Sequence, residues 1–208
     1  MIIALEGADA AGKATQAAIL VDRLQDRTIY DTQSMSFPDY TTETGRVIRW
    51  MLVGELAFEG ADVKKRVSAL TLQALMSANR YEHFGALRDA ERERALVLDR
   101  YWISGLAYGL ADGLDRRWLL AIHEALPLAI HVLIDVPEDE ALRRRPEARD
   151  RFERDHVKQQ VVRVVYGDIF TKPENFGSRL IGRVRRVNGV GDVQAVADRI
   201  WDAVVDDL

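Results

Sequence analysis

A glycine-rich segment near the N-terminus has the spacing of a phosphate-binding loop. Residues 7–13 read GADAAGK and fit the pattern G-x-x-x-x-G-K. The glycines allow a turn that points successive backbone N–H groups at phosphate oxygens, and a helix starting there adds positive potential. Lys13 would bridge the outer phosphates; the alternative is an ordinary strand–helix turn with a solvated lysine. The loop residues expected to contact phosphate are Gly7, Ala8, Ala10, Ala11 and Gly12.

The residues after this lysine depart from the pattern. Ala14 stands where Ser or Thr normally supplies a hydroxyl ligand to Mg²⁺, and Thr15 follows one place late. Water can fill the missing ligand position, because Mg²⁺ gives up its hydration reluctantly. Both residues are still expected beside the nucleotide, and the magnesium site is expected to be weaker without loss of catalysis.

A second charged group follows a run of four apolar residues that predicts a buried strand. Asp99 and Arg100 come directly after this run, at the end of a strand where parallel α/β folds bind ligands. Arg100 and Arg80 are candidates to clamp a phosphate, and Asp99 to orient magnesium-bound water or the loop lysine. The alternatives are a helix N-cap for Asp99 and a surface ion pair of Arg80 with Glu82 or Glu91.

These groups need a scaffold of alternating strands and helices. Ile2–Leu5 predicts a buried strand, and apolar residues at helical spacing predict a helix over 14–24, directly after the loop. Further strands are predicted over 28–33, 95–99, 129–135 and 184–188, and further helices over 43–53, 63–80, 86–94, 104–110, 116–124, from 138, over 151–166 and over 192–205. This alternation favours one α/β domain over 1–208, with a five-stranded parallel sheet between two helical layers.

The composition excludes several other classes of protein. The 208 residues, 48% of them hydrophobic, can bury a full core, and the absence of cysteine excludes disulfide frameworks, thiol nucleophiles and cysteine-based metal sites. The net charge of −4 argues against a protein that coats nucleic acid. No apolar run reaches the roughly 18 residues of a membrane span, and no basic leader is visible. We therefore expect a cytoplasmic protein without nucleic-acid or membrane partners.

Five segments together resemble the thymidylate kinase family, in particular its eukaryotic and viral branch. They are GADAAGKATQ at 7–16, FPD at 37–39 with TETG at 42–45, SANRYE at 77–82, DRY at 99–101 with SG at 104–105 and AY at 107–108, and RDRFE at 149–153. One such segment would be a weak sign, but five in register are specific.

The resemblance implies a three-layer P-loop kinase that transfers the γ-phosphoryl group of ATP to dTMP, giving dTDP and ADP with Mg²⁺, and that forms a homodimer. On the matching positions Asp9 would bind the sugar 3′-hydroxyl, Tyr108 would crowd a 2′-hydroxyl, and the loop at Asn188 would lie along adenine. Asp9 could equally form an Asx turn, and Tyr108 could simply pack. The other positions implied at the acceptor are Phe37, Met76, Ser104, Gly105 and Phe152.

Six arginines fall between residues 143 and 154, where the family closes a lid on the triphosphate. Some members supply the catalytic arginine from the phosphate loop, but Ala10 occupies that position here. The charge is therefore expected from Arg143, Arg144 or Arg149. The alternative is a solvated, charged turn.

Two departures concern the acceptor. Tyr40 stands where the family carries an arginine to the acceptor phosphate, and Met76 stands where relatives often stack a phenylalanine on thymine. A deoxynucleoside kinase, with Asp39 as its general base, is therefore the nearest rival function. A degenerate nucleotide-binding regulator, suggested by Ala14, is the rival from another class.

Overall fold

Five parallel strands form one sheet in the computed structural model, which describes residues 1–27, 31–53, 68–92, 94–144, 156–180 and 182–208. The order is β2-β3-β1-β4-β5, so that β1 lies in the centre of the sheet. In register, Ile3 of β1 is opposite Val97 of β3 on one side and Ile130 of β4 on the other. The strands are β1 (Ile2–Glu6), β2 (Thr32–Ser36), β3 (Ala95–Asp99), β4 (Ile130–Asp135) and β5 (Val184–Asn188). The predicted five-stranded parallel sheet is confirmed.

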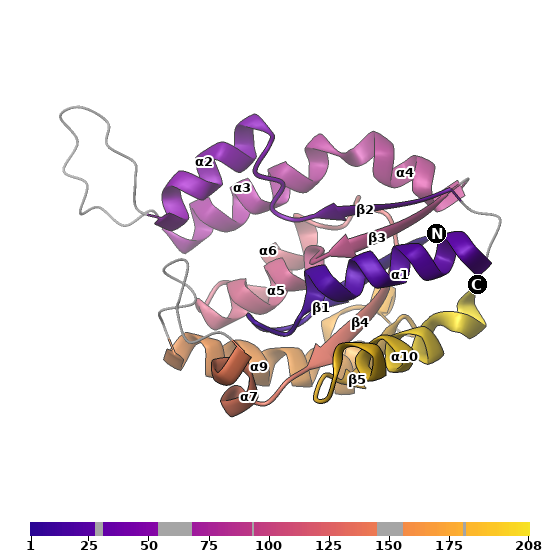
Figure 1. Cartoon of the computed structure of the whole chain (residues 1–208). Coiled ribbons are helices and arrows are strands. Elements are labelled where there is room, and N and C mark those ends of the chain that lie inside the picture. The colour runs from indigo at the N-terminus through magenta and orange to yellow at the C-terminus, as the bar shows by residue number, and fades with distance from the viewer. Residues whose placement is uncertain (28–30, 54–67, 93, 145–155, 181) are drawn as a thin grey trace.

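Helices lie on both faces of this sheet (Figure 1). Helices α1 and α10 pack on one face, while α4, α5 and α9 pack on the other. Helices α2 and α3 pack against each other, and α3 also contacts α5. The helices are α1 (Lys13–Arg27), α2 (Glu43–Val53), α3 (Ala69–Glu82), α4 (Phe84–Arg92), α5 (Trp102–Ala111), α6 (Arg116–Ala121), α7 (Glu138–Arg144), α9 (His156–Thr171) and α10 (Val193–Val204). Among the described residues, no helix is long and apolar enough to cross a membrane.

The side chains of β1 divide between the two cores. Ile3 and Leu5 face the α1 and α10 side, whereas Ile2 and Ala4 face the α5 side. Because successive strand side chains alternate between faces, Glu6 also falls on the α5 side, where it is fully buried. The final residue of the central strand therefore brings a carboxylate into the core.

The strand order creates a crevice at the carboxyl ends of β1 and β3. The chain leaves β1 through α1 toward β2, and it leaves β3 through α5 toward β4, so the two connections run in opposite directions. Open parallel sheets bind ligands at such a switch point. Both candidate groups found in the sequence, the loop at 7–13 and the Asp99–Arg100 pair, lie at this crevice.

Several predicted boundaries were wrong. The second strand was predicted over 28–33 but occupies Thr32–Ser36, where it is an edge strand with mostly exposed side chains and hence a weak hydrophobic pattern. Helix α5 begins at Trp102 rather than 104, because its residues are buried on nearly all sides and no polar face marks its start.

Gly45 provides a test of how α2 is fixed. A Cβ at this position would lie 1.7 Å from the backbone oxygen of Asp39, so the backbone itself would have to move. We expect Gly45→Ala to lower the free energy of unfolding by at least about 2 kcal/mol in urea titration. Gly167→Ala, in α9 with nothing within 4 Å, should instead raise it by about 0.5–1 kcal/mol. Equal stability of the Gly45 variant and the parent would contradict this packing.

Candidate active site

The loop between β1 and α1 is shaped around Gly7. Its φ of +150°, with φ of +62° at Ala10 and +87° at Gly12, wraps the chain into the turn expected of a phosphate loop. A Cβ on Gly7 would lie 2.8 Å from the backbone oxygen of Ile134, so a side chain would collide with β4. Lys13 follows at the start of α1, almost fully buried, with Nζ donating to the backbone oxygens of Ala8 at 2.9 Å and Gly7 at 3.3 Å.

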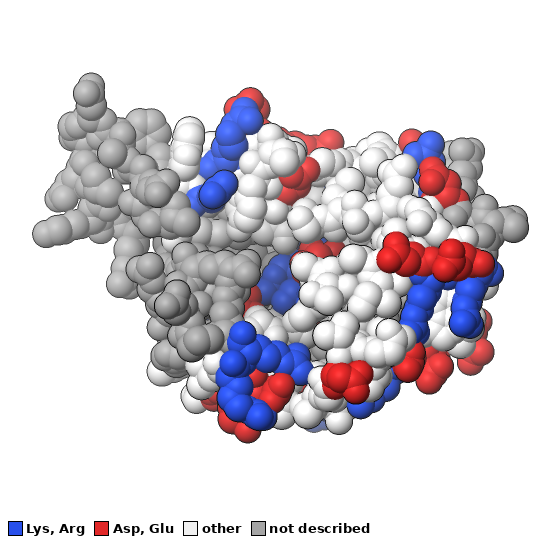
Figure 2. Space-filling view, in the orientation of Figure 1, with Lys and Arg blue, Asp and Glu red and all other residues white. Residues whose placement is uncertain are grey.

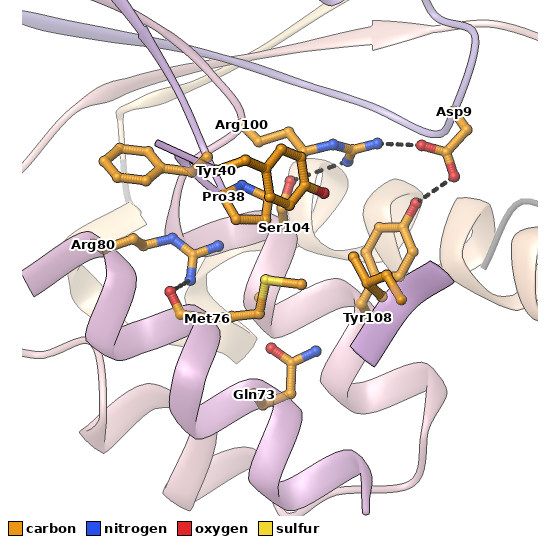
Figure 3. A pocket seen from close by; sticks show the side chains of 12 residues that line it. Asp9, Pro38, Tyr40, Gln73, Met76, Arg80, Arg100, Ser104 and Tyr108 are labelled. Atoms are coloured by element: carbon orange, nitrogen blue, oxygen red, sulfur yellow. Dashed lines mark hydrogen bonds and ion pairs between the residues drawn. The ribbon is translucent and has the colours of Figure 1, made fainter. Parts of the chain in front are cut away.

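Arg100 joins the end of β3 to this loop. Its Nη1 donates to the Gly7 oxygen at 3.1 Å and to Ser104 Oγ at 3.3 Å, and its Nη2 forms an ion pair with Asp9. The backbone of Arg100 has φ of +68°, an uncommon conformation outside glycine, and it aims the guanidinium at the loop. Figure 3 shows this pair at one end of a pocket.

Three side chains bind the Asp9 carboxylate. Besides the ion pair, its Oδ2 accepts hydrogen bonds from the Tyr108 hydroxyl at 3.1 Å and from Gln159 Nε2 at 2.8 Å. Burial alone would raise the pKa of Asp9, but the charges of Arg100 and Lys13 and these hydrogen bonds outweigh it and lower the pKa. Asp9 is therefore an ionised acceptor facing the pocket, and its oxygens do not form the Asx turn weighed above.

Lys13 experiences opposing charges. Burial and the positive charge of Arg100 lower its pKa to about 8, and the carboxylates of Asp99, Asp9 and Glu6 limit the shift. Figure 2 shows Lys or Arg and Asp or Glu atoms together in a hollow beside the N-terminal end of α1. Two cations and three carboxylates thus share the crevice, and an incoming polyanion would relieve the repulsion between the cations.

Glu6 is a participant that the sequence analysis missed. Its Oε1 accepts from the backbone N–H of Tyr101 at 3.1 Å and its Oε2 from Ser104 Oγ at 2.6 Å; His131 Nδ1 lies 3.4 Å away. These contacts fix the turn that carries Arg100. A charged residue ending an otherwise apolar strand was the signal that could have revealed it.

Gln159 was also missed. It reaches Asp9 from α9, 150 positions further along the chain, and no local spacing indicates that contact.

The pocket extends from Arg100 toward α3, with about 510 Å³ of space between its walls, part of it open to solvent. It brings together eight of the predicted acceptor residues. These are Asp9, Phe37, Met76, Arg80, Arg100, Ser104, Gly105 and Tyr108. The walls also include Pro38, Tyr40, Leu52 and Gln73.

Arg80 is buried in the wall of this pocket. Its Nη1 donates to the Met76 backbone oxygen at 2.8 Å and its Nη2 to the Tyr101 oxygen at 2.9 Å, while its guanidinium lies 5.9 Å from the Phe37 ring centroid. Burial lowers its pKa to about 10. Glu82, weighed as its surface partner, instead accepts from Asn79 at 3.0 Å. The buried guanidinium of Arg80 therefore faces the pocket and does not form an ion pair with Glu82.

Asp99 ends β3 partly exposed, and its negative charge acts on Lys13. It is not a helix N-cap, because α5 is preceded by Tyr101 without a side-chain cap. Asp39, the general base that a deoxynucleoside kinase would need, does not line the pocket. Its carboxylate accepts a hydrogen bond from the Thr41 backbone N–H at 2.9 Å, and His83 Nε2 lies 3.1 Å from it.

Three of the residues expected on the ATP side lie at the surface. Ala14 and Thr15 are exposed on the first turn of α1, and Asn188 is exposed at the end of β5, where its Oδ1 accepts from the Val190 N–H. Arg144 donates to Gly189 at 2.7 Å and to Glu140 at 2.8 Å, so it ties α7 to the loop after β5.

Two of the predicted lid arginines, Arg143 and Arg144, are among the described residues. Arg143 is largely exposed and paired with Glu140. The other predicted lid residues, Arg149 and Phe152, lie outside the described residues. Among those described, no cluster of three or more His, Cys, Asp or Glu could hold a metal ion by itself.

Comparison with known proteins gives the family. The thymidylate kinase family model matches residues 5–177. The chain belongs to the thymidylate kinase family. It is 34% identical over 145 residues to a probable thymidylate kinase of Pyrococcus horikoshii, covering 68% of each chain. It is 26% identical over 166 residues to the thymidylate kinase of Dictyostelium discoideum, covering 79% of this chain and 71% of the relative.

A solved structure agrees in fold. Thymidylate kinase from Candida albicans superposes with a TM-score of 0.77 at 24% identity, over 99% of this chain and 91% of that chain. The predicted thymidylate kinase family, its three-layer α/β fold and the kinase activity that follows from the family are confirmed.

The lowered pKa of Lys13 makes nucleotide binding depend on pH. Below about pH 8 the free protein carries the lysine as a cation, and above it the charge is lost. Binding of ADP, whose phosphates are already ionised there, should weaken by up to about tenfold per pH unit as pH rises above 8. Calorimetric titration of ADP between pH 7 and 9.5 measures this. Lys13→Arg should bind with no such dependence; equal affinity of the parent at both ends of the range would contradict the assignment.

Proposed function

We propose that this chain phosphorylates dTMP with ATP through a site formed where β1 and β3 end. The observation that carries the proposal is Arg100, which contacts the phosphate loop at Gly7 and Asp9 and at the same time lines the pocket. One guanidinium thereby borders both the donor and the acceptor. A phosphoryl transfer between two anions needs such a shared cation at the point where they meet.

The donor triphosphate would bind along the backbone N–H groups of residues 7–13, with Lys13 released from its bonds to the loop oxygens. Magnesium would arrive with ATP, since it prefers phosphate and water oxygens. The residues at hand fit that role, because Asp99 offers one carboxylate near Lys13 and Ala14 leaves its position to water. The metal would neutralise charge on the transferred group.

The acceptor would lie in the pocket with its phosphate toward Arg100. Asp9, ionised, is ready to accept from the sugar 3′-hydroxyl, and Tyr108 beside it would crowd a 2′-hydroxyl. Phe37 and Met76 offer apolar faces to the base, and the cation of Arg80 borders the same space.

An oxygen of the dTMP phosphate attacks the γ-phosphorus as the bond to the bridging oxygen of ADP breaks. A phosphate monoester is already ionised at pH 7, so this step needs no general base. A deoxynucleoside kinase would need a carboxylate at the 5′-hydroxyl, and Asp39 is engaged by Thr41 and His83 away from the pocket. The arrangement therefore favours the monophosphate as acceptor.

The remaining assignments follow the family resemblance. We assign the lid to residues 143–154 of one kinase domain over 1–208. The lid charge would come from Arg143, Arg144 or Arg149, with Phe152 near the acceptor. Asn188 would border adenine, and Arg144, bonded to the neighbouring Gly189, supports this position. A homodimer and a cytoplasmic location belong to the same proposal.

A panel of acceptors tests the function. With ATP and Mg²⁺, dTMP should yield dTDP and ADP, dUMP should react about tenfold less well for want of the C5 methyl group, and thymidine should give no product. ADP release, with the products identified by chromatography, is the measurement. Phosphorylation of thymidine with dTMP ignored would make the chain a deoxynucleoside kinase.

Ala14→Ser tests the magnesium site. The added hydroxyl should supply one ligand, a gain on the order of 1.5–3 kcal/mol at most, and so lower the Mg²⁺ concentration needed for half-maximal rate. Calorimetry of Mg²⁺ with the ADP complex gives a second readout. Ala18→Ser, the same change one turn later on the exposed side of α1, should alter neither. A parent inert with every acceptor, together with activity restored by Ala14→Ser, would identify a degenerate kinase.

A further inference from the structure

A buried glutamine in the pocket wall has an unsatisfied oxygen. Gln73 of α3 is only 2% exposed, and its Oε1 has no hydrogen-bond partner among the residues that the structure describes. The amide nevertheless lines the pocket, and Figure 3 shows it on the side of α3 that carries Met76. A buried carbonyl oxygen without a donor is costly, so the donor is expected from what the pocket binds.

The position of Gln73 on α3 would place its amide beside the base of a nucleotide bound in the pocket. Met76 follows three residues later and Arg80 four residues after that, so the three side chains share one face of the helix. All three line the pocket, whereas Asp9, Arg100 and Ser104 line its other end, next to the phosphate loop. A nucleotide whose phosphate meets Arg100 would extend its base toward α3, with Gln73 at the edge of the ring and not at the sugar.

We propose that Gln73 is a substrate-binding residue that contacts the imide edge of the pyrimidine. Oε1 accepts the N3–H of thymine, and Nε2 donates to a neighbouring carbonyl oxygen of the ring. A carboxamide has the donor–acceptor pair that this edge requires, as in bidentate amide contacts to bases. The inference rests on the proposed function, in that it takes the pocket as the dTMP site.

The test must address N3 itself. A glutamine amide can turn over and pair with cytosine as well, so Gln73 alone does not separate thymine from cytosine. N3-methyl-dTMP removes the donor and adds bulk at this one atom. The comparison is therefore between dTMP and N3-methyl-dTMP, in the parent and in Gln73→Ala, where truncation removes the acceptor and makes room for the methyl group.

The parent should bind and phosphorylate N3-methyl-dTMP at least about 100-fold less well than dTMP. Gln73→Ala should lose roughly tenfold on dTMP, the loss expected from one neutral hydrogen bond, and should gain on the methylated analogue. The ratio between the two substrates should consequently fall at least about tenfold. Gln194→Ala, the same truncation at an exposed position of α10, should leave the ratio unchanged.

Dissociation constants from calorimetry and kcat/KM are both measured, because together they test the proposed function and the role of Gln73 separately. If dTMP binds and is never phosphorylated, the proposed function fails while the binding ratio still tests Gln73. If dTMP is phosphorylated and Gln73→Ala shifts both substrates by the same factor, the role of Gln73 is overturned and the function stands. Gln73→Met, which keeps the volume, shows whether a loss comes from the missing amide or from a cavity: it should weaken dTMP binding as alanine does, and parent-like affinity would overturn the proposal.

Discussion

The site depends on a group of charges held where two neighbouring parallel strands end. Burial and the neighbouring positive charge of Arg100 both lower the pKa of Lys13, and Asp9 and Glu6 hold the two cations together. Asp9 binds Arg100 directly, and Glu6 binds the turn that follows it, at Tyr101. The parallel sheet brings these residues within reach although β1 and β3 are some 90 positions apart. Phosphate oxygens placed between Lys13 and Arg100 would attract both cations.

The opposite wall of the pocket consists of side chains of helix α3, and the loop that contains Asp39 and Thr42 holds this helix in place. Asn79 of α3 accepts from the Asp39 N–H at 2.7 Å and donates to Thr42 Oγ1 at 2.8 Å. Gly45 then lies against the Asp39 carbonyl group. These family-motif residues position α3, while Gln73, Met76 and Arg80 face the pocket. Some residues of this segment thus hold helix α3 in place, and others line the pocket.

Local patterns were enough to predict the phosphate loop and the Asp99–Arg100 pair, because each follows an apolar strand within a few residues. The orientation of helix α3 was harder to predict, because the spacing of its apolar residues does not show which side packs on α5. The burial of Arg80 was therefore found only in the structure. Glu6 and Gln159 act through contacts with residues more than 90 positions away, which no spacing encodes. The predicted bounds of edge strand β2 were wrong by several residues, because its side chains are mostly polar and exposed and give no clear apolar pattern.

The central claim is that donor and acceptor phosphates meet between Lys13 and Arg100. A crystal structure with adenosine and thymidine joined through five phosphates tests it most directly. The account predicts that the phosphate chain passes along residues 7–13 and between these two cations, with thymine against α3 and adenine near the loop after β5. A phosphate chain bound away from Arg100, or thymidine outside the pocket, would contradict it.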